Sequence, residues 1–337
     1  MSNMFRNIVL IALILTFFVV VLGAYVRLSD AGLGCPDWPG CYGKLLGVPT
    51  SDVEVNEANT NFDRAVEIGK AWKEMIHRYF AGTLGILIFI ISLYLVRKDE
   101  NGQRHIFSGV ILTSLLIFQA LLGMWTVTLQ LKPLIVMGHL LGGFALFNLI
   151  AWQWLRTTAF DIQLYVKDKS ALTFLAVITI FIAVCQIALG GWVSSNYAAL
   201  ACTDFPQCQQ SWWPEMDFTN GFILWRGLGV DYEFGVLEHP ARVAIHYTHR
   251  IGAIVAAVAV IYYVTQLWTR SDSASRSLNK IGLIILCLLI AQIGLGISNI
   301  YFKLPLLVAV AHNGVALLLL FSLVSSLYMV RSAQIYR

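Results

Sequence analysis

The sequence predicts an all-α polytopic membrane protein in which eight transmembrane helices form two tandem four-helix bundles. Three observations lead to this prediction. Hydrophobic residues make up 58% of the 337 residues, whereas charged residues make up only 12%. The apolar residues gather in runs close to the ~20 residues with which a helix crosses a bilayer. Motifs of the first half also recur, in the same order, in the second half.

Helices are expected for these runs because a segment in lipid must satisfy its backbone polar groups internally. The first run lacks a small-residue cleavage site followed by a polar chain, so it is predicted to be a retained span and not a signal peptide. The eight predicted spans cover residues 7–27, 73–96, 107–129, 134–156, 171–193, 242–268, 279–300 and 306–330.

The distribution of Lys and Arg predicts the orientation, because basic residues are retained on the cytoplasmic side of short loops. Two hairpins carry one basic residue each, Lys132 and Lys303. The opposing loops carry three each: Arg97, Lys98 and Arg104; Arg156, Lys167 and Lys169; Arg270, Arg276 and Lys280. Both termini are therefore expected in the cytoplasm, and the two long loops, about 28–72 and 194–241, outside. The net charge of +4 mostly reflects this signal and requires no nucleic-acid partner.

An internal duplication divides the chain into two similar halves. Leu22-Gly23, Cys35, Pro39 and Cys41 recur 167 residues later as Leu189-Gly190, Cys202, Pro206 and Cys208. His77-Arg78 recurs after 172 residues as His249-Arg250, and Gln119, Gly123 and His139 recur after 173 as Gln292, Gly296 and His312. We therefore predict an N-terminal bundle over 1–156, a basic cytoplasmic linker over 157–170 and a C-terminal bundle over 171–337, as parallel repeats.

Each half carries one histidine near the outer end of its second span and one near that of its fourth. His77 lies five residues beyond Trp72 and His139 six beyond Pro133, which places both about 7–9 Å inside their helices. Two imidazoles that face each other at one level can bind one iron from opposite sides, as in a bis-histidine haem. The same reasoning applies to His249 and His312. The alternatives are hydrogen-bonded structural histidines and a bare zinc or copper site, which lacks third and fourth ligands here.

Arg78 and Arg250 directly follow a histidine in each half, so they point about 100° away from it around the helix. A fixed positive charge beside a haem suits the haem propionates. The alternative is that both arginines snorkel to the outer interface. Several glycines near the histidines suit either a flat macrocycle or close helix packing: Gly82, Gly85, Gly142, Gly143, Gly252 and Gly314.

One position breaks the duplication. Three residues before the histidine, the first half has Glu74 and the second half has His246. This spacing puts each residue on the same helix face as the histidine that follows. A carboxylate there can exchange a proton with a substrate or stabilise a developing positive charge. The alternative is that Glu74 faces headgroup water beside Lys73.

The two long loops each contain a pair of cysteines with five residues between them: Cys35 and Cys41, and Cys202 and Cys208. An oxidising compartment permits a disulfide that staples the loop, but a thiol pair can also exchange electrons. The staple is favoured for Cys202 and Cys208. For Cys35 and Cys41, which lie in the half with Glu74, both interpretations stay open.

The specific loop and helix signatures are Leu22-Gly-Ala-Tyr-Val-Arg-Leu-Ser, Gly34-Cys-Pro-Asp-Trp-Pro-Gly-Cys41, Glu74-x-x-His77-Arg78, Phe222-x-x-Trp225-Arg226 and Pro240-Ala-Arg-Val-Ala-Ile-His246-x-x-His249-Arg250. Over nearly the whole chain, the sequence resembles the haem A synthase family, the bacterial CtaA and mitochondrial Cox15 group. The resemblance implies an oxidoreductase of the bacterial cytoplasmic membrane. Such an enzyme oxidises the C8 methyl group of haem O to a formyl group, giving haem A for cytochrome oxidase assembly.

The resemblance also implies a division of labour. A permanent haem b is expected on His249 and His312, and the substrate haem O and product haem A around His77 and His139. Glu74 matches the functional glutamate of the family. The second cysteine pair is implied to form a disulfide, and the first pair is linked to activity in bacterial relatives. Haem O synthase and cytochrome oxidase assembly factors are the implied partners, besides haem O and membrane lipid.

Two other functions compete with this one. A di-haem b-type electron carrier between a quinol and a periplasmic acceptor would use all four histidines as permanent ligands. A membrane thiol oxidoreductase would act through the cysteine pairs and would not need the histidines. A transporter is disfavoured because the polar groups concentrate near the outer ends of the spans and not at the midplane.

Overall fold

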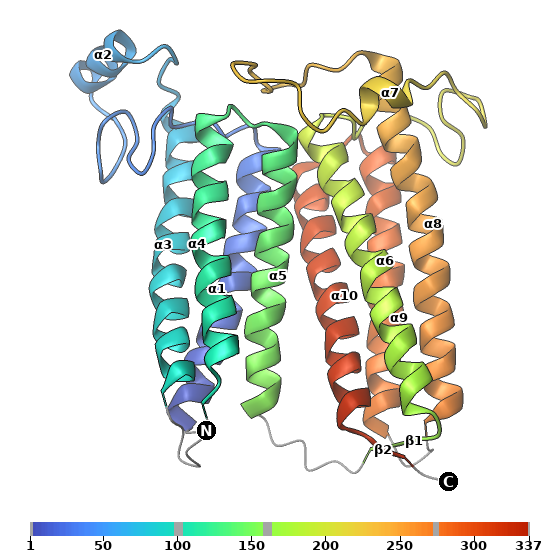
Figure 1. Ribbon diagram of the computed structural model, residues 1–337. Helices are drawn as coiled ribbons and strands as arrows, with labels where there is room; N and C mark the ends of the chain where they lie inside the picture. Colours follow the sequence, from blue (N-terminus) through green and yellow to red (C-terminus); the bar gives the residue numbers. More distant parts are fainter. Residues whose placement is uncertain (1–2, 98–103, 158–163, 272–275, 336–337) are drawn as a thin grey trace.

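The computed structural model describes residues 3–97, 104–157, 164–271 and 276–335. Helices dominate these residues (Figure 1), and eight of the helices are long and apolar enough to cross a membrane. They are α1 (Asn3–Leu28), α3 (Ile68–Val96), α4 (Ile106–Thr128), α5 (Pro133–Thr157), α6 (Lys169–Ser195), α8 (His239–Arg270), α9 (Arg276–Tyr301) and α10 (Leu306–Ser332). The prediction of an all-α polytopic membrane protein with eight spans is confirmed.

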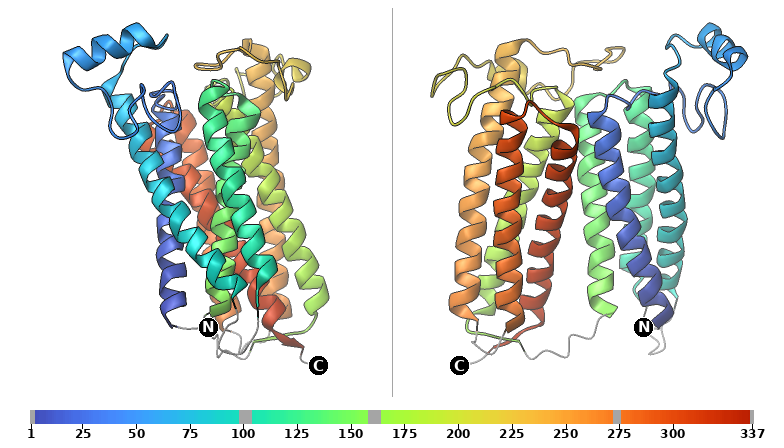
Figure 2. Two further views of the ribbon diagram at one scale, coloured as in Figure 1. Left: turned by 60° about the vertical axis from the view of Figure 1, so that its left-hand side comes forward. Right: turned by 180° about the vertical axis from the view of Figure 1, so that it is seen from behind.

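In each half, the helices pack so that two of them lie diagonally opposite each other: α3 and α5 in the first half, and α8 and α10 in the second. In the first half, α1 and α4 each pack on both α3 and α5, so α3 and α5 face each other across the centre. In the second half, α6 and α9 each pack on both α8 and α10. The two sets of helices stand side by side in Figure 1 and in the right-hand view of Figure 2.

A continuous apolar core joins the two sets of helices. The helices α1 and α5 also pack on α10, and α5 packs on α6. Within this shared core, the rings of Phe147 and Phe321 meet edge to face with their centroids 5.7 Å apart. The separation into bundles over 1–156 and 171–337 therefore stays a prediction. Part of the predicted linker, residues 158–163, lies outside the described residues.

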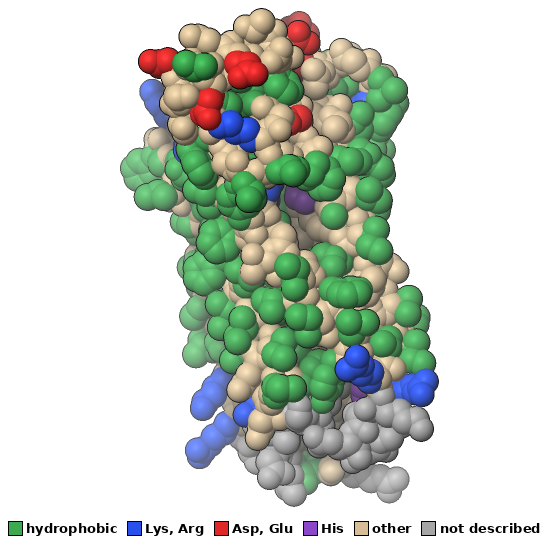
Figure 3. All heavy atoms as spheres, turned by 90° about the vertical axis from the view of Figure 1, so that its left-hand side faces the viewer, with side chains coloured by type: hydrophobic (Ala, Val, Ile, Leu, Met, Phe, Trp, Pro, Cys, Tyr) green, Lys and Arg blue, Asp and Glu red, His purple; other side chains and the backbone are tan. Residues whose placement is uncertain are grey.

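Both termini lie at one end of the helices, and the two long loops lie at the other (Figure 1). We call these the terminal end and the loop end. On the face shown in Figure 3, acidic side chains gather at the loop end, and Lys and Arg side chains flank the terminal end. This charge pattern agrees with the predicted placement of the termini in the cytoplasm, which stays a prediction.

The loop end contains two short helices that were not predicted, α2 (Asp52–Asn61) and α7 (Phe218–Gly221). A capping box starts α2: the Glu54 N–H donates to the Ser51 side chain, and the Glu54 carboxylate accepts from the Ser51 N–H. This Ser-x-x-Glu spacing is a visible signal in the sequence. At the terminal end, β1 (Tyr165–Val166) pairs in parallel with β2 (Gln334–Ile335).

Acidification is expected to loosen the α2 segment. The hydrogen bond from Lys44, followed by those from the Thr50 and Ser51 N–H groups, lowers the pKa of Glu54 from 4.5 to about 2. Because the folded-state pKa lies below the ordinary value, this stabilisation is complete above about pH 4.5 and is lost as the pH falls toward 2. Hydrogen-exchange protection of the α2 amides, corrected for intrinsic rates, measures the loss.

In the Glu54→Gln variant, the α2 amides should be as weakly protected at every pH as those of the unmodified protein are at low pH. The matched control is Glu57→Gln, an exposed position on the same helix, which should behave as the unmodified protein does. Equal protection of the unmodified protein across this pH range would contradict the assigned role of Glu54.

The helices α3 and α8 begin earlier than predicted, at Ile68 and His239 instead of 73 and 242. In α3 the extra turn includes Lys70, whose side chain pairs with that of Glu67, the residue just before the helix, at 2.8 Å. Hydropathy alone does not detect such a turn. Glu74 and His77 consequently lie in the second and third turns of α3 and not at its head.

Candidate functional site

The four repeated histidines share one packing arrangement: each ring lies against a glycine of a neighbouring helix. The glycines come from α1 and α4 in the first half, and from α6 and α9 in the second. If the glycine carried a Cβ, that atom would lie only 3.0–3.3 Å from Cε1 of the imidazole. The distance is 3.0 Å for Gly23 and His77, 3.3 Å for Gly123 and His139, 3.2 Å for Gly190 and His249, and 3.1 Å for Gly296 and His312. Because most real Cβ contacts are longer, a side chain at any of these glycines would displace the imidazole.

The histidines of each half lie on helices that face each other. His77 is on α3 and His139 on α5, and His249 is on α8 and His312 on α10. These are the helices that lie diagonally opposite each other in each half. In the face shown in Figure 3, a histidine is visible in a hollow near the loop end.

The histidine set fits a haem iron better than a bare metal ion. The Nδ1 atoms of His77, His139 and His312 are buried without a hydrogen-bond partner, which argues against purely hydrogen-bonded structural histidines. Within the described ranges, no group of three or more His, Cys, Asp or Glu side chains is placed to hold a metal ion. Two imidazoles suffice for a porphyrin iron, whereas zinc and copper sites need more protein ligands. Iron ligation by the four histidines stays a prediction.

Three glutamines contact the histidines. Gln119 donates from its amide to the His139 carbonyl at 2.7 Å, and the amide nitrogen of its counterpart, Gln292, lies 3.4 Å from His312 Nε2. Gln186 lies beside His249 and was not predicted, because it falls outside the repeated motifs. The available signal was an amide in the middle of an otherwise apolar run. Two of the glycines noted in the sequence serve these amides: Gly142 makes room for Gln119, and Gly252 makes room for Gln186.

Glu74 is buried, with 5% of its surface exposed, and it anchors the first cysteine loop. Its Oε2 accepts the Cys35 N–H at 2.9 Å, and its Oε1 accepts from the guanidinium of Arg78. Arg78 also donates to the carbonyls of Asp37 at 2.9 Å, Pro39 at 3.3 Å and Gly40. The carboxylate therefore points into the protein and not to headgroup water beside Lys73.

The second half repeats this anchor with a histidine in place of the carboxylate. His246 is also 5% exposed. The Cys202 N–H lies 3.4 Å from its Nδ1, and Arg250 Nε lies 3.2 Å from its Nε2; a neutral imidazole accepts at one of these two nitrogens. Arg250 donates further to the carbonyls of Gln207 at 2.8 Å, Cys202 at 3.0 Å and Asp204 at 2.9 Å. The two arginines thus hold the cysteine loops on α3 and α8, and their contact with haem propionates stays a prediction.

Both cysteine pairs form disulfides, Cys35–Cys41 and Cys202–Cys208, and all four residues are buried. In each loop, an aspartate side chain between the two cysteines accepts hydrogen bonds from two backbone N–H groups that follow the second cysteine. Asp37 accepts the N–H groups of Tyr42 and Gly43, and Asp204 accepts those of Gln209 and Gln210. Burial raises the pKa of Asp204, but these N–H groups and Arg250 outweigh burial and hold the pKa below its usual range. The staple interpretation therefore describes both loops as they stand.

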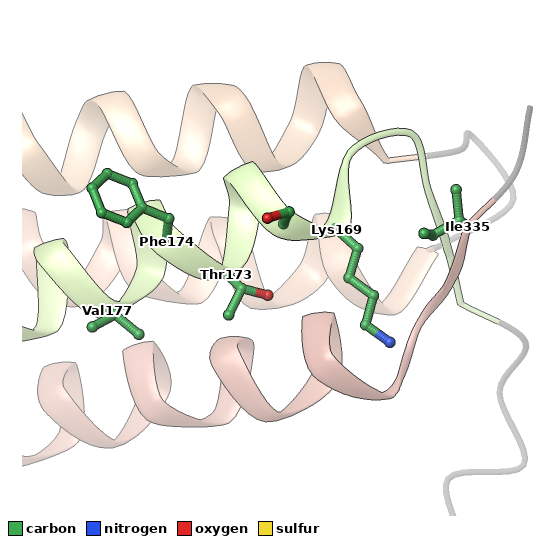
Figure 4. Close-up of a pocket in the computed structure, with 6 residues that line it drawn as sticks. Lys169, Thr173, Phe174, Val177 and Ile335 are labelled. Atoms are coloured by element: carbon green, nitrogen blue, oxygen red, sulfur yellow. The ribbon is translucent and has the colours of Figure 1, made fainter.

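A surface pocket lies far from these groups, at the terminal end (Figure 4). The ammonium of Lys169 donates to the Ala333 carbonyl at 2.9 Å beside it. The lining residues are Lys169, Ser170, Thr173, Phe174, Val177 and Ile335. None of the candidate site residues belongs to this pocket.

Comparison with known proteins shows the family of the chain. Residues 6–324 match the model of the COX15-CtaA family, described as cytochrome oxidase assembly protein. The chain belongs to the COX15-CtaA family. A relative from Shewanella oneidensis named heme A synthase is 46% identical over 319 residues, which cover 94% of both chains. Heme A synthases from Rhizorhabdus wittichii and Halalkalibacterium halodurans are 26% identical over 349 residues and 27% identical over 302 residues.

These alignments cover most of each chain. The Rhizorhabdus relative is matched over 95% of this chain and 92% of its own length, and the Halalkalibacterium relative over 87% and 86%. The family match therefore includes both histidine pairs and both cysteine loops of this COX15-CtaA member. This COX15-CtaA protein is a multi-pass membrane protein.

Proposed function

We propose that this protein is a haem A synthase of the bacterial cytoplasmic membrane, which oxidises the C8 methyl group of haem O to the formyl group of haem A. The observation that carries the proposal is the 46% identity with a relative named heme A synthase over 94% of both chains. The two facing histidine pairs support it, because two porphyrins need two pairs of axial ligands. A di-haem electron carrier would give no reason for a buried carboxylate in one half only.

In this proposal, His249 and His312 hold a permanent haem b, and His77 and His139 hold the substrate. A haem b on His249 and His312 would supply a centre that carries electrons. His77 and His139 would hold the substrate through its iron, and the glycines at their rings keep the two imidazoles in place.

Glu74 lies on α3 three residues before His77, on the same face of the helix. Arg78 and the Cys35 N–H hold its carboxylate in place near the loop end of the first half, the half proposed to bind the substrate. A fixed charge in a site of low dielectric stabilises positive charge that develops on a bound substrate. His246, at the matching place, is an imidazole that already accepts from Arg250 and does not supply this charge.

The proposal extends to the cellular setting. Both termini lie in the cytoplasm and the cysteine loops outside, where an oxidising environment maintains their disulfides. Haem O reaches the protein through the membrane, so contact with haem O synthase and with cytochrome oxidase assembly factors is expected.

Supply of the substrate tests the proposed reaction. Membranes that contain this protein should form haem A only when haem O is also supplied, as measured by pigment extraction and mass analysis. The His77→Ala variant, with haem O present, serves as the matched negative control. Formation of no haem A by the unmodified protein under these conditions would reject the proposed activity.

The glycines beside the histidines should separate the two halves. A valine at Gly190 is expected to displace the His249 ring and to lower the haem b content on the order of tenfold. A valine at Gly23 is expected to displace His77, leaving the haem b content unchanged and lowering haem A formation.

The control is Gly294→Val, because an added Cβ there meets open space. Haem content of the purified variants and haem A yield are the two measurements. Loss of haem b in the Gly23→Val variant would contradict the assignment of the two halves.

A further inference from the structure

His249 differs from the other three repeated histidines in its hydrogen bonding. The amide nitrogen of Gln186 lies 3.0 Å from His249 Nδ1 and also donates to the His249 carbonyl at 3.0 Å. The Nδ1 atoms of His77, His139 and His312 are buried without a partner. One glutamine on α6 therefore fixes both the backbone and the ring of His249.

The space for this glutamine is built into α8. A Cβ added at Gly252 would lie 2.3 Å from Gln186 Oε1, so a larger residue would expel the amide. In the first half, the residue that matches Gln186, 167 positions earlier, is Val19, and the residue that matches Gly252, 172 positions earlier, is Phe80. The first half has lost both the amide and the space for it.

The contact matters because a ring nitrogen opposite the iron controls a histidine ligand. A neutral imidazole that binds iron through Nε2 carries its proton on Nδ1, and that proton needs an acceptor. Gln186 Oε1 is buried without a partner, and rotation of the amide brings this oxygen to His249 Nδ1 in exchange for the donation to the His249 carbonyl. Such a hydrogen bond fixes the ring orientation and increases the basicity of the ligand.

We propose that Gln186 is a positioning residue that makes the second half the one that retains its haem. Val19, at the matching place, leaves His77 without this support, so the first half can exchange substrate for product. This inference rests on the proposed division between a permanent and an exchangeable haem. It adds the reason why two similar halves differ.

The Gln186→Val variant copies the first half and tests the inference. The purified protein with bound haem is mixed with excess apomyoglobin, and haem transfer is followed by absorbance. Haem b should leave the variant about ten- to a hundred-fold faster than the unmodified protein. Its midpoint potential should rise, because a less basic ligand stabilises ferric iron less. Unchanged transfer and an unchanged potential would overturn the proposal.

Two further variants separate positioning from packing. Gln186→Glu retains an acceptor and should keep slow haem transfer with a lower midpoint potential. Cys185→Val, at the neighbouring exposed position, is the matched control and should change neither quantity. Rapid haem loss from Gln186→Glu to the same extent as from Gln186→Val would overturn the hydrogen-bond role.

A reciprocal variant, in which the first half receives the residues of the second, tests the proposal even if Gln186→Val does not fold. Val19→Gln combined with Phe80→Gly should slow the loss of haem from the first half; no slowing would overturn the proposal. A His249→Ala control distinguishes the two levels of inference. If that variant keeps its haem b, the division between the halves fails; if it loses haem b while Gln186→Val retains it firmly, only the role of Gln186 fails.

Discussion

The His249→Ala and His312→Ala variants are expected to lose the permanent haem spectrum completely. Each histidine comes from one of two diagonally opposed helices, α8 and α10. A bis-histidine iron that loses one axial ligand loses the spectrum of that ligand set, and the hydrophobic pocket alone holds a porphyrin weakly. Absorbance spectra of the purified variants, in the oxidised and reduced states, measure the effect.

The control for these variants is His105→Ala. His105 lies at the terminal end, where its Nδ1 is 3.1 Å from the Arg156 side chain, so its removal should leave the haem spectrum unchanged. A normal spectrum in either His249→Ala or His312→Ala would refute the ligand assignment. The His77→Ala and His139→Ala variants should keep the haem b spectrum and fail to form haem A.

Replacement of Glu74 should abolish haem A formation while haem b remains. A group that stabilises charge or moves a proton in the reaction contributes about 10²–10⁴-fold to the rate. However, Glu74→Ala also removes the partner of the half-buried Arg78, and breaking a fully buried pair typically costs about 3–5 kcal/mol. The Cys35 N–H would lose its acceptor as well. A loss of activity in this variant alone would therefore not separate chemistry from structure.

The second half of the protein provides a sharper variant, Glu74→His. His246 shows that an imidazole fits at this place, between the loop N–H and the arginine side chain. Glu74→His should therefore keep the first cysteine loop folded and haem b bound, yet form at least about a hundred-fold less haem A. Haem A yield and haem b content are measured together. Normal product formation by this variant would remove the carboxylate from the mechanism.

The helices, and the positions of the histidines on them, were predictable because their signals are local or repeated. Apolar length alone identifies a span, and the duplication places His77 and His139 in the same relation as His249 and His312. The disulfides were predictable as an option from the spacing of the cysteines. For Cys35 and Cys41, spacing did not decide between a staple and free thiols, and the structure has the disulfide.

Contacts between segments far apart in the sequence were not predictable. From the sequence, Arg78 and Arg250 were expected to pair with haem propionates or to extend to the membrane interface. In the structure, both guanidinium groups donate hydrogen bonds to carbonyls of the cysteine loops. Lys132 was counted only as a basic residue of a hairpin. It is 2% exposed, its ammonium lies 3.6 Å from the centroid of the Trp225 ring, and it donates to the Gly227 carbonyl. Burial lowers its pKa.

These long-range contacts also connect the two halves at the loop end. The guanidinium of Arg27 donates to the Ser194 carbonyl at 2.6 Å. Arg64 pairs with Glu233 at 2.5 Å and with Asp231 at 3.3 Å. The duplication predicts only contacts that occur in both halves. The contacts between the halves occur once, so they could not be predicted from it.

Pigment analysis of the purified protein, produced with a supply of haem O, tests the central claim most directly. The two halves are proposed to bind porphyrins in the same way, with one half keeping its haem and the other exchanging it. The expected result is one firmly bound haem b per chain, together with a variable, smaller amount of haem O or haem A. Two haems b per chain, with neither haem O nor haem A, would contradict this account and favour the electron carrier.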